Sequence, residues 1–450
     1  MSRLYTPQRL NLSPRIGLAY DPFGDGKSSI RAGYSIAYQP LHGYTSFGAS
    51  ADPPDLIQAI LQPNEGIGTN ILYGIPVPFN PEFQTTLNAQ GGVVSTPGKS
   101  SIRIAPWVVD PSYKTQSSES WFFNVQREVA RKWIVELGYV GTNGINLERR
   151  DDINRFDGDL IVNDGKLERI NHNFGPMTFV ENGVTSSYNA MTAEVRHQIG
   201  GGLTLQANYR WSKWLDTSSD TSANFFTDNP EGAKGPEDTA CLRCERGRSI
   251  FDIPRRFTAS VVWAPQIFKG DSLLNKFGKN WQISSIITAQ SGRPFEPWCS
   301  ASFQAGCDFN ADGGGAIGAG TYDRPDAPAR GAVKPSFGKQ DFLNGVFSPS
   351  IFPIPTPGTD GNLGRDVYRG PQQINTDLAL MRSFRVREGK DLQFRFEGFN
   401  ALNNVNLYLP NDDMALALKP NKTFSTTSSF GKSTQAFDPR ILQLSARFVF

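Results

Sequence analysis

The sequence predicts an all-β fold and, within that class, a transmembrane antiparallel β-barrel. Segments in which apolar and polar residues alternate recur along the chain, and this period of two is typical of β-strands. Short and long connections between these segments also alternate, as in outer-membrane barrels with short periplasmic turns and long extracellular loops. No stretch approaches the roughly 18 apolar residues of a membrane helix, so any membrane span must be a strand.

Eleven strands are expected in chain order. In the segment 203–214, for example, leucine, alanine, tyrosine and tryptophan alternate with threonine, glutamine, asparagine and arginine. A face that carries arginine must meet water, whereas an aromatic face must meet an apolar medium. The short connections FGDGKS, VARK, GGG and REGK join neighbouring strands. The expected strands are 13–22, 29–39, 119–128, 133–147, 188–198, 203–214, 256–264, 281–290, 374–386, 390–401 and 441–450.

The chain ends inside the last of these strands. Leu442, Leu444, Ala446, Phe448 and Phe450 fall on one face, with polar residues between them. Chain ends usually fray, so an apolar face that continues to the final residue predicts a strand that closes the barrel at the periplasmic rim. Single bacterial chains form barrels with even strand numbers, and eleven is odd. We therefore expect the C-terminal half of a barrel, whose first and last strands either remain open edges or pair with each other.

Composition narrows the classes of function. Phe (31 residues), Gly (44) and Pro (31) are abundant, and the hydrophobic fraction of 38% lies below the roughly 45–50% of soluble domains, a value that includes glycine. The formal net charge of +2 is near balance, whereas binding to nucleic acid needs a clustered basic face, so we expect no nucleic-acid partner. The first residues, MSRLYTPQRLNLSPRIG, lack the apolar segment of a signal peptide, which predicts either a cytoplasmic protein or a chain without its natural beginning.

Segments spread over nearly all of the chain carry a family resemblance. They are SPRIGLAYDPFGDGKSSIRAGYSIAY, QREVARKWIVELGYVGTNGINL, SSYNAMTAEVRHQIGGGLTLQANYRWSKWLD, CERGRSIFDIPRRFTAS, ISSIITAQSGRPF, GNLGRDVYRGPQQINTDLALMRSF, LQFRFEGFNALNNVN and the terminal strand. In sequence and in order they resemble the C-terminal half of the barrel of TonB-dependent outer-membrane receptors, of the large Oar-like type whose N-terminus carries a carboxypeptidase-regulatory-like domain. Such barrels typically have 22 strands, so residues 1–450 would form the C-terminal portion of one barrel domain.

The resemblance implies a location, partners and a mechanism. The chain would lie in the cell outer membrane of a Gram-negative bacterium, in contact with outer-membrane lipid, and its long loops would bind an extracellular ligand of unknown identity. In the full-length receptor, a TonB-type energy-coupling protein would displace the plug for energised uptake. We expect the family's signal peptide, TonB-contacting box, plug domain and N-terminal strands to be absent here. Two alternatives stay open, a surface barrel for adhesion or matrix attachment without transport, and a non-functional truncated copy.

No arrangement of residues predicts catalysis, so we expect that the protein is not an enzyme. The three histidines lie far apart and in no nucleophile or metal motif. They are His42, His172 and His197. Three carboxylates lie on inward strand positions beside arginines, as in the polar lumen of a barrel. The carboxylates are Glu136, Glu194 and Glu397, and the arginines are Arg196, Arg210 and Arg395. A soluble secreted enzyme would need a catalytic cluster, and its outward aromatic faces would form patches larger than soluble monomers carry.

The four cysteines form two closely spaced pairs. Cys241 and Cys244 lie in CLRC, and Cys299 and Cys307 lie in WCSASFQAGCDF. Both pairs fall in long loops expected to face the cell exterior, where cysteines are oxidised, so we predict two local disulfides. A zinc site is less favoured, because zinc ribbons place their C-x-x-C pairs within roughly 15–20 residues of each other. Free thiols, or disulfides that cross between the two loops, also stay open.

The stretch DFNADGGG has the spacing of a calcium-binding loop. Asp308, Asn310 and Asp312 match the first ligands of such a loop, and a glycine follows at the position of the sharp turn. The twelfth position is Ala319 in place of the closing glutamate, so an EF-hand is excluded. The pattern is more typical of a Gly-rich surface turn, and a looser Ca²⁺ site completed by Asp323 or by backbone carbonyls is the alternative. We expect no other cofactor.

Two long connections, at about 40–118 and about 292–373, are the expected ligand-binding surface. They are rich in Pro, Gly, Phe and Asn, and function often resides on loops held by a rigid scaffold. The first connection contains PPDLIQAILQPNEG, in which Leu56, Ile57, Ile60 and Leu61 predict a short amphipathic helix.

Overall fold

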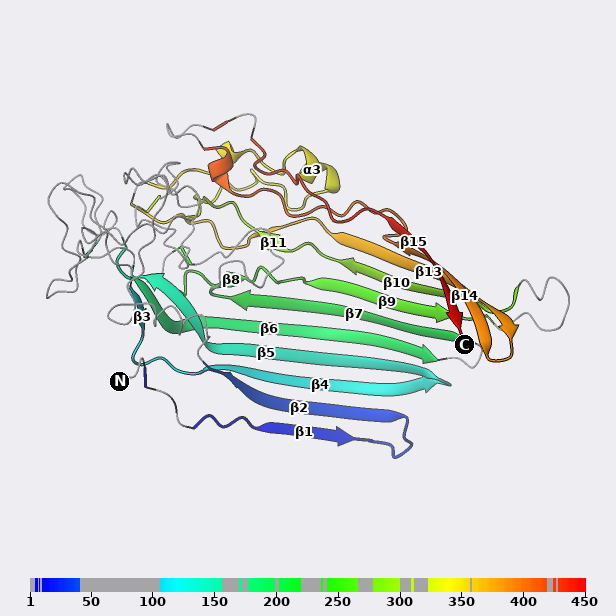
Figure 1. The fold of residues 1–450 in the computed structure, drawn as a ribbon. Helices are drawn as coiled ribbons and strands as arrows, with labels where there is room; N and C mark the ends of the chain where they lie inside the picture. Colours follow the sequence, from blue (N-terminus) through cyan, green and yellow to red (C-terminus); the bar gives the residue numbers. More distant parts are fainter. Residues whose placement is uncertain are drawn as a thin grey trace, which may run out of the picture.

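The computed structural model arranges eleven strands in one antiparallel sheet, as the sequence predicts (Figure 1). Each strand pairs with the next one along this path, so the chain forms an antiparallel meander. The structure describes residues 5, 6, 8, 10–40, 106–155, 170–171, 177–198, 202–219, 236–237, 241–265, 278–299, 309–310, 323–356, 358–418, 424–425 and 428–450. The strands of the path are β1 (Arg15–Tyr20), β2 (Ser28–Gln39), β4 (Gln116–Ala130), β5 (Trp133–Asp152), β6 (Thr178–Gln198), β7 (Leu203–Asp216), β9 (Arg255–Trp263), β10 (Trp281–Gln290), β13 (Gln373–Arg387), β14 (Lys390–Phe399) and β15 (Ile441–Val449).

The largest differences from the predicted boundaries lie in β5 and β6, which extend further toward the long loops. The alternating pattern predicts an end at 147 and a start at 188, whereas the paired strands continue to Asp152 and begin at Thr178. The register of this pair shifts between Gly144 and Leu147. A shift in register breaks the period of two, so the pattern in the sequence ends before the strands do.

Several very short elements of the structure are absent from the prediction. Strands of two or three residues show no period, and their pairing depends on residues that are distant in sequence. They are β3 (Trp107–Val109), which runs parallel to β6, β8 (Gly247–Arg248), which pairs with β7, and β11 (Pro294–Phe295) and β12 (Tyr368–Arg369), which pair with each other. The helix α3 (Lys339–Asn344) and the 3₁₀ turns η2 (Pro349–Ile351) and η3 (Met414–Leu416) are likewise not predicted by the sequence pattern. The helix expected at Leu56, Ile57, Ile60 and Leu61 lies outside the described residues.

The two ends of the sheet differ in their connections. At the end that holds Phe450, the short connections 21–27, 131–132, 199–202 and 388–389 join neighbouring strands, and a longer one, 264–280, joins β9 to β10 (Figure 1). The turn at 388–389 places Gly389 at a φ of 72°, which glycine adopts without strain. All of the longest connections lie at the opposite end, as the alternation of loop lengths predicts.

The sheet is open. β1 and β15 lie at its two edges, and β15 pairs only with β14 among the described strands. The closure predicted for the last strand is therefore not made within the described part of this chain. Of the two outcomes expected for the first and last strands, the structure contains the open edges. The described residues include no helix that is long and apolar enough to cross a membrane.

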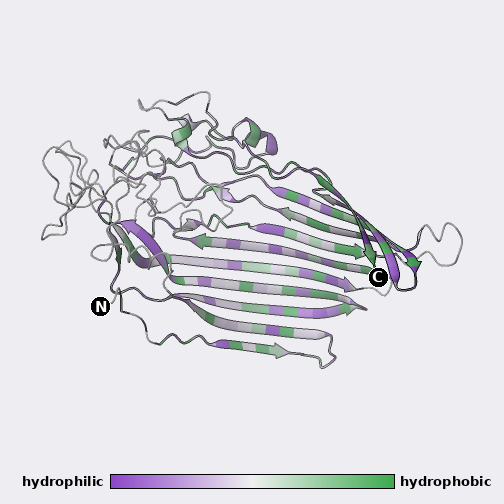
Figure 2. Cartoon of the chain, viewed as in Figure 1, coloured by the Kyte–Doolittle hydropathy of each residue, from purple (hydrophilic) through white to green (hydrophobic). Residues whose placement is uncertain are grey.

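The sheet has one apolar and one polar face, as Figure 2 shows by the alternating colours along the strands. The apolar face carries large side chains that are unusually exposed. They include Ile16, Leu18, Leu137, Met191, Tyr209, Trp211, Leu442, Leu444 and Phe448. The polar face carries ion pairs: Arg196 lies 3.2 Å from Glu136 and 2.7 Å from Glu194, and Arg395 lies 2.7 Å from Glu397. Apolar residues outside and polar residues inside are the arrangement of an outer-membrane barrel.

Replacement of Leu444 by lysine is expected to destabilise the chain in lipid by about 2–4 kcal/mol, because a charge on the apolar face would meet hydrocarbon. Leu444 is 81% exposed and lies in the middle of β15. The measurement is a urea titration of folding into phospholipid vesicles. Gln443→Lys is the matched control, since it places the same charge on the polar face of the same strand and should change the stability by less than about 1 kcal/mol. Equal losses in the two variants would contradict this assignment of the faces.

Candidate functional site

The candidate site is a packed layer of loops at the end of the sheet opposite Phe450. We call it the loop layer and define it as the described parts of 217–254, 291–372 and 400–440, which connect β7 to β9, β10 to β13 and β14 to β15 (Figure 1). These connections contain few regular elements, yet their buried side chains form a core of their own. The layer contains the described part of the second connection that the sequence predicts to bind a ligand.

Aromatic side chains form the core of the loop layer. The ring of Phe347 lies 5.9 Å from that of Phe295, 5.1 Å from that of Phe352 and 5.8 Å from that of Phe430. Because Phe430 belongs to the last loop and the other rings to the loop before β13, this contact joins two loops. The buried members of the core are Phe295, Cys299, Phe309, Phe342, Phe347, Phe352, Leu363, Leu407, Met414, Ala417, Leu418 and Phe430.

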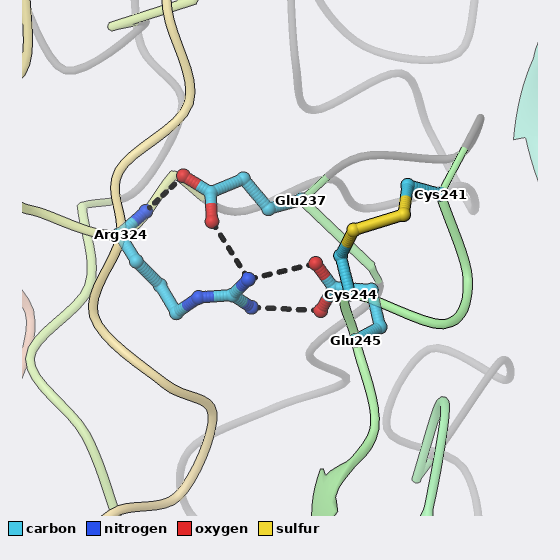
Figure 3. Close-up of a disulfide and its surroundings, with 5 residues drawn as sticks. All are labelled: Glu237, Cys241, Cys244, Glu245 and Arg324. Carbon is cyan, nitrogen blue, oxygen red and sulfur yellow. Dashed lines mark hydrogen bonds and ion pairs between the residues drawn. A yellow bond between two sulfur atoms is a disulfide. The ribbon is translucent and has the colours of Figure 1, made fainter.

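A buried ion cluster joins two loops of the layer. Figure 3 shows the guanidinium of Arg324 between the carboxylates of Glu237 and Glu245. Arg324 donates to both carboxylate oxygens of Glu245, at 2.8 and 2.7 Å, and lies 2.8 Å from Oε2 of Glu237. The backbone N–H groups of Arg324 and Gly361 donate to Oε1 of Glu237 at 2.9 and 3.0 Å. Both carboxylates are about 1% exposed, so one cation serves two anions that water does not reach.

Burial shapes the electrostatics of this cluster. It raises the pKa of Glu237 to about 7, and the attraction of Arg324 and two backbone donors only partly opposes this shift. The pKa of Arg324 is raised, because its hydrogen bonds to Glu245 and the charge of Glu237 outweigh desolvation. The guanidinium therefore stays charged.

Further arginines attach the loop before β13 to the ends of neighbouring strands. Arg365 pairs with Asp216, the last residue of β7, and Arg369 pairs with Asp252. Arg248 donates to the backbone carbonyls of Asp366 and Val367 at 3.2 and 2.7 Å. These contacts hold the loop before β13 against β7, β8 and the segment before β9.

The structure joins Cys241 and Cys244 by a disulfide. The backbone N–H of Cys244 donates to the carbonyl of Cys241 at 2.8 Å. The residue after Cys244 is Glu245, so the disulfide constrains the segment that carries this ion-pair partner of Arg324 (Figure 3). Cys299 is also disulfide-bonded and buried in the aromatic core. Cys307, its predicted partner, lies outside the described residues.

The calcium site stays a prediction. Asp308 and Asp312 lie outside the described residues. The side-chain amide of Asn310 donates to Oδ1 of Asp360 at 2.8 Å, and Oδ2 of Asp323 accepts a hydrogen bond from the backbone N–H of Phe309. Among the residues that the structure describes, no three His, Cys, Asp or Glu side chains lie close enough together to hold a metal ion.

Of the three histidines, the structure describes His197. His42 and His172 lie outside the described residues. His197 lies at the short-turn end of β6, where its ring stacks on Trp133 at 3.9 Å and its Nδ1 lies 3.0 Å from the carbonyl oxygen of Lys132. This contact stabilises a strand end, far along the strands from the loop layer.

A pocket of about 540 Å³ lies on the polar face, where the strands meet the loop layer. Its walls combine side-chain amides with two phenylalanines. Its lining residues are Arg256, Thr288, Gln290, Gln373, Asn375, Asp377, Phe399, Asn400, Asn406, Phe437, Asp438, Pro439 and Ile441. This pocket is not among the sequence predictions, although the residues at the inward positions of β13 could have indicated it. These residues are Gln373, Asn375 and Asp377. Three consecutive amide or acid side chains at a period of two indicate a polar surface that faces something other than lipid.

The chain matches one family model and is similar to several solved structures. The family model described as "Outer membrane beta barrel domain" matches residues 1–443. The outer membrane transporter YddB from Escherichia coli is 10% identical, with a TM-score of 0.49, and the match covers 98% of this chain and 40% of that one. The ferripyoverdine receptor of Pseudomonas aeruginosa is 9% identical, with a TM-score of 0.40 and coverage of 97% and 32%.

The ferric enterobactin receptor PfeA from Pseudomonas aeruginosa gives a similar result, with 9% identity, a TM-score of 0.42 and coverage of 98% of this chain and 40% of that one. No curated protein matches the sequence. This chain thus spans about a third to two-fifths of the length of these solved structures.

Proposed function

The chain belongs to the outer membrane beta-barrel domain family and lies in the outer membrane, and on this premise we propose that it is the barrel portion of a receptor for energised uptake. In this proposal the loop layer captures an extracellular ligand, and a TonB-type protein supplies the energy for its passage. The observation that carries the proposal is the internal packing of the loop layer, which contains an aromatic core and a buried ion cluster and meets a polar pocket at the ends of the strands.

An ordered loop costs conformational entropy. Fixing the backbone of one residue costs roughly 1–2 kcal/mol, so a long loop is ordered only where its contacts compensate. Here two loops share a buried core, and three arginines attach one of them to neighbouring segments. A rigid layer of this kind presents a fixed surface to a ligand and lowers the entropic cost of binding.

The sequence segments that resemble TonB-dependent receptors support the second half of the proposal. Energy coupling in that family acts through a plug, and the plug and the coupling protein would be partners of the barrel in the full-length receptor. A surface barrel used for adhesion would also present ordered loops, but it would act without an energy source.

The proposal is tested by measuring which solutes the native host removes from its medium. We expect that deletion of the gene for this chain leaves at least one solute undepleted, that disruption of the TonB-type protein has the same effect, and that the double mutant adds nothing further. A gene copy with Lys334→Ala, a change at an exposed ion pair, should restore depletion fully. Unchanged depletion in the deletion strain, or additive defects in the double mutant, would contradict transport. Loss of surface attachment that does not depend on the TonB-type protein would indicate adhesion instead.

A further inference from the structure

Two arginines lie directly opposite each other on the polar face of the sheet. Arg210 of β7 and Arg256 of β9 are cross-strand partners, in the register that also pairs Tyr209 with Phe257 on the apolar face. Side chains at such positions have their Cβ atoms roughly 4.5–5.5 Å apart, and like charges there destabilise a sheet. An arrangement that costs stability needs a compensating partner.

No described residue supplies that partner. Neither guanidinium forms an ion pair or hydrogen bond with the residues that the structure describes, and Nε of Arg210 is buried without an acceptor. The nearest carboxylates on this face already have partners. Glu194 accepts from Arg196 at 2.7 Å and from Gln206 at 3.1 Å, and Asp377 accepts from the side chain of Asn375 and the backbone of Asn400.

Acids at the ends of the strands are also engaged. Asp252 accepts from the backbone N–H of Trp214 at 2.8 Å and pairs with Arg369, and Asp216 pairs with Arg365. Each acid therefore neutralises another group of the loop layer. Arg210 and Arg256 therefore have no carboxylate partner among the residues that the structure describes.

The pocket described above lies beside this pair. Arg256 lines it together with Gln290, its cross-strand partner on β10, and Gln290 donates to Gln373 at 2.7 Å. Phe399 and Phe437 form apolar parts of the wall. A volume of about 540 Å³ lies within the range of roughly 300–1,000 Å³ that is typical of small-molecule sites, as does a mixture of apolar wall and a few directed polar groups.

We propose that Arg210 and Arg256 form an oxyanion site at the edge of this pocket, which binds the carboxylate or phosphate group of a small ligand. Guanidinium groups present paired N–H donors that match the oxygens of a carboxylate or phosphate. One oxyanion between the two arginines would turn their repulsion into attraction, and the amides and phenylalanines of the pocket would hold the uncharged remainder of the ligand. The inference rests on the proposed function, because it takes the molecule in the pocket to be the captured ligand. It identifies the chemical class of that ligand as an anion.

The test is calorimetric titration of the full chain, refolded in detergent, with citrate and separately with inorganic phosphate at constant ionic strength. We expect at least one of the two anions to bind, and Arg256→Gln and Arg210→Gln each to weaken its binding by at least tenfold. Arg256→Lys keeps the charge but loses the paired donors, so it should lie between these variants and the wild type. Arg31→Gln is the matched control: it removes one positive charge from the same face at a position bonded to Ser29, and it should leave the affinity unchanged.

Thermal unfolding provides a second measurement that does not depend on a loss of binding. Without an added anion, Arg256→Gln should unfold at the same temperature as the wild type or a higher one, because it removes a repulsion. Citrate or phosphate should raise the unfolding temperature of the wild type more than chloride at equal ionic strength, and should not do so for Arg256→Gln.

Three results would overturn the inference. They are the absence of binding by both anions, an equal loss of affinity in Arg31→Gln, and binding of an acidic peptide where neither small anion binds, which would assign the pair to a protein partner. Because titration does not require transport, its failure leaves the uptake proposal standing. Failure of the uptake experiment with intact anion binding would instead remove the proposed function alone.

Discussion

Replacement of Arg324 by alanine is expected to destabilise the loop layer by about 3–5 kcal/mol, because it leaves two buried carboxylates without their shared cation. Glu237 and Glu245 are each about 1% exposed, so water cannot replace the lost partner. The measurement is hydrogen exchange of the amides in residues 323–356, where exchange should accelerate by about 100-fold to 1,000-fold or more. Exchange in the central strands of the sheet should change little, since the cluster lies among the loops.

Lys334→Ala is the control for this variant. Lys334 pairs with Asp341 at 2.8 Å, but its side chain is 66% exposed. An exposed pair contributes roughly 0–1 kcal/mol, so exchange should change by less than about fivefold. A triple variant, Arg324→Met with Glu237→Gln and Glu245→Gln, should recover part of the lost stability, because it removes all three charges together. If Arg324→Ala and Lys334→Ala have the same effect, the buried cluster does not hold the loop layer.

The sheet could be predicted from the sequence because its signals are local. The alternation along a strand and a tight turn such as REGK are both patterns within about 25 neighbouring residues. The predicted strands 281–290 and 390–401 accordingly agree closely with β10 and β14. The CLRC pair is local too, since its two cysteines are three residues apart. Where β5 and β6 change register, the period is lost and the predicted ends are wrong.

The packing of the loop layer could not be predicted, because its contacts join residues that are distant in sequence. Arg324 is 79 residues from Glu245, and Arg365 is 149 residues from Asp216. Nothing near either arginine in the sequence identifies its partner. The prediction that Arg210 lies on the polar face is consistent with the structure, but the register that places Arg256 opposite it depends on the length of the connection from β7 to β9. The sequence thus indicates which residues face inward, and only the three-dimensional arrangement indicates which of them lack a partner.

Phe342→Ala is expected to destabilise the loop layer by about 3–5 kcal/mol, the usual cost of truncating a buried phenylalanine. Phe342 is 2% exposed, lies in the aromatic core and has its ring 5.8 Å from that of Phe337. The neighbouring residue of α3, Leu343, is 42% exposed, so Leu343→Ala should change the stability by less than about 0.5 kcal/mol. Both variants can be compared by the hydrogen exchange of residues 323–356 and by limited proteolysis of the same segment.

The cause of the loss in Phe342→Ala can be separated from a general loosening of the loops. Removal of one ring from a rigid, apolar core should leave a cavity that stays dry and accepts a small aromatic molecule. Benzene should therefore slow hydrogen exchange in Phe342→Ala and leave the exchange of the wild type and of Leu343→Ala unchanged. A loop layer that collapses around the missing ring would not respond to benzene, and its core would then be too plastic to present a fixed binding surface. Rescue by benzene would support the rigid layer on which ligand capture depends.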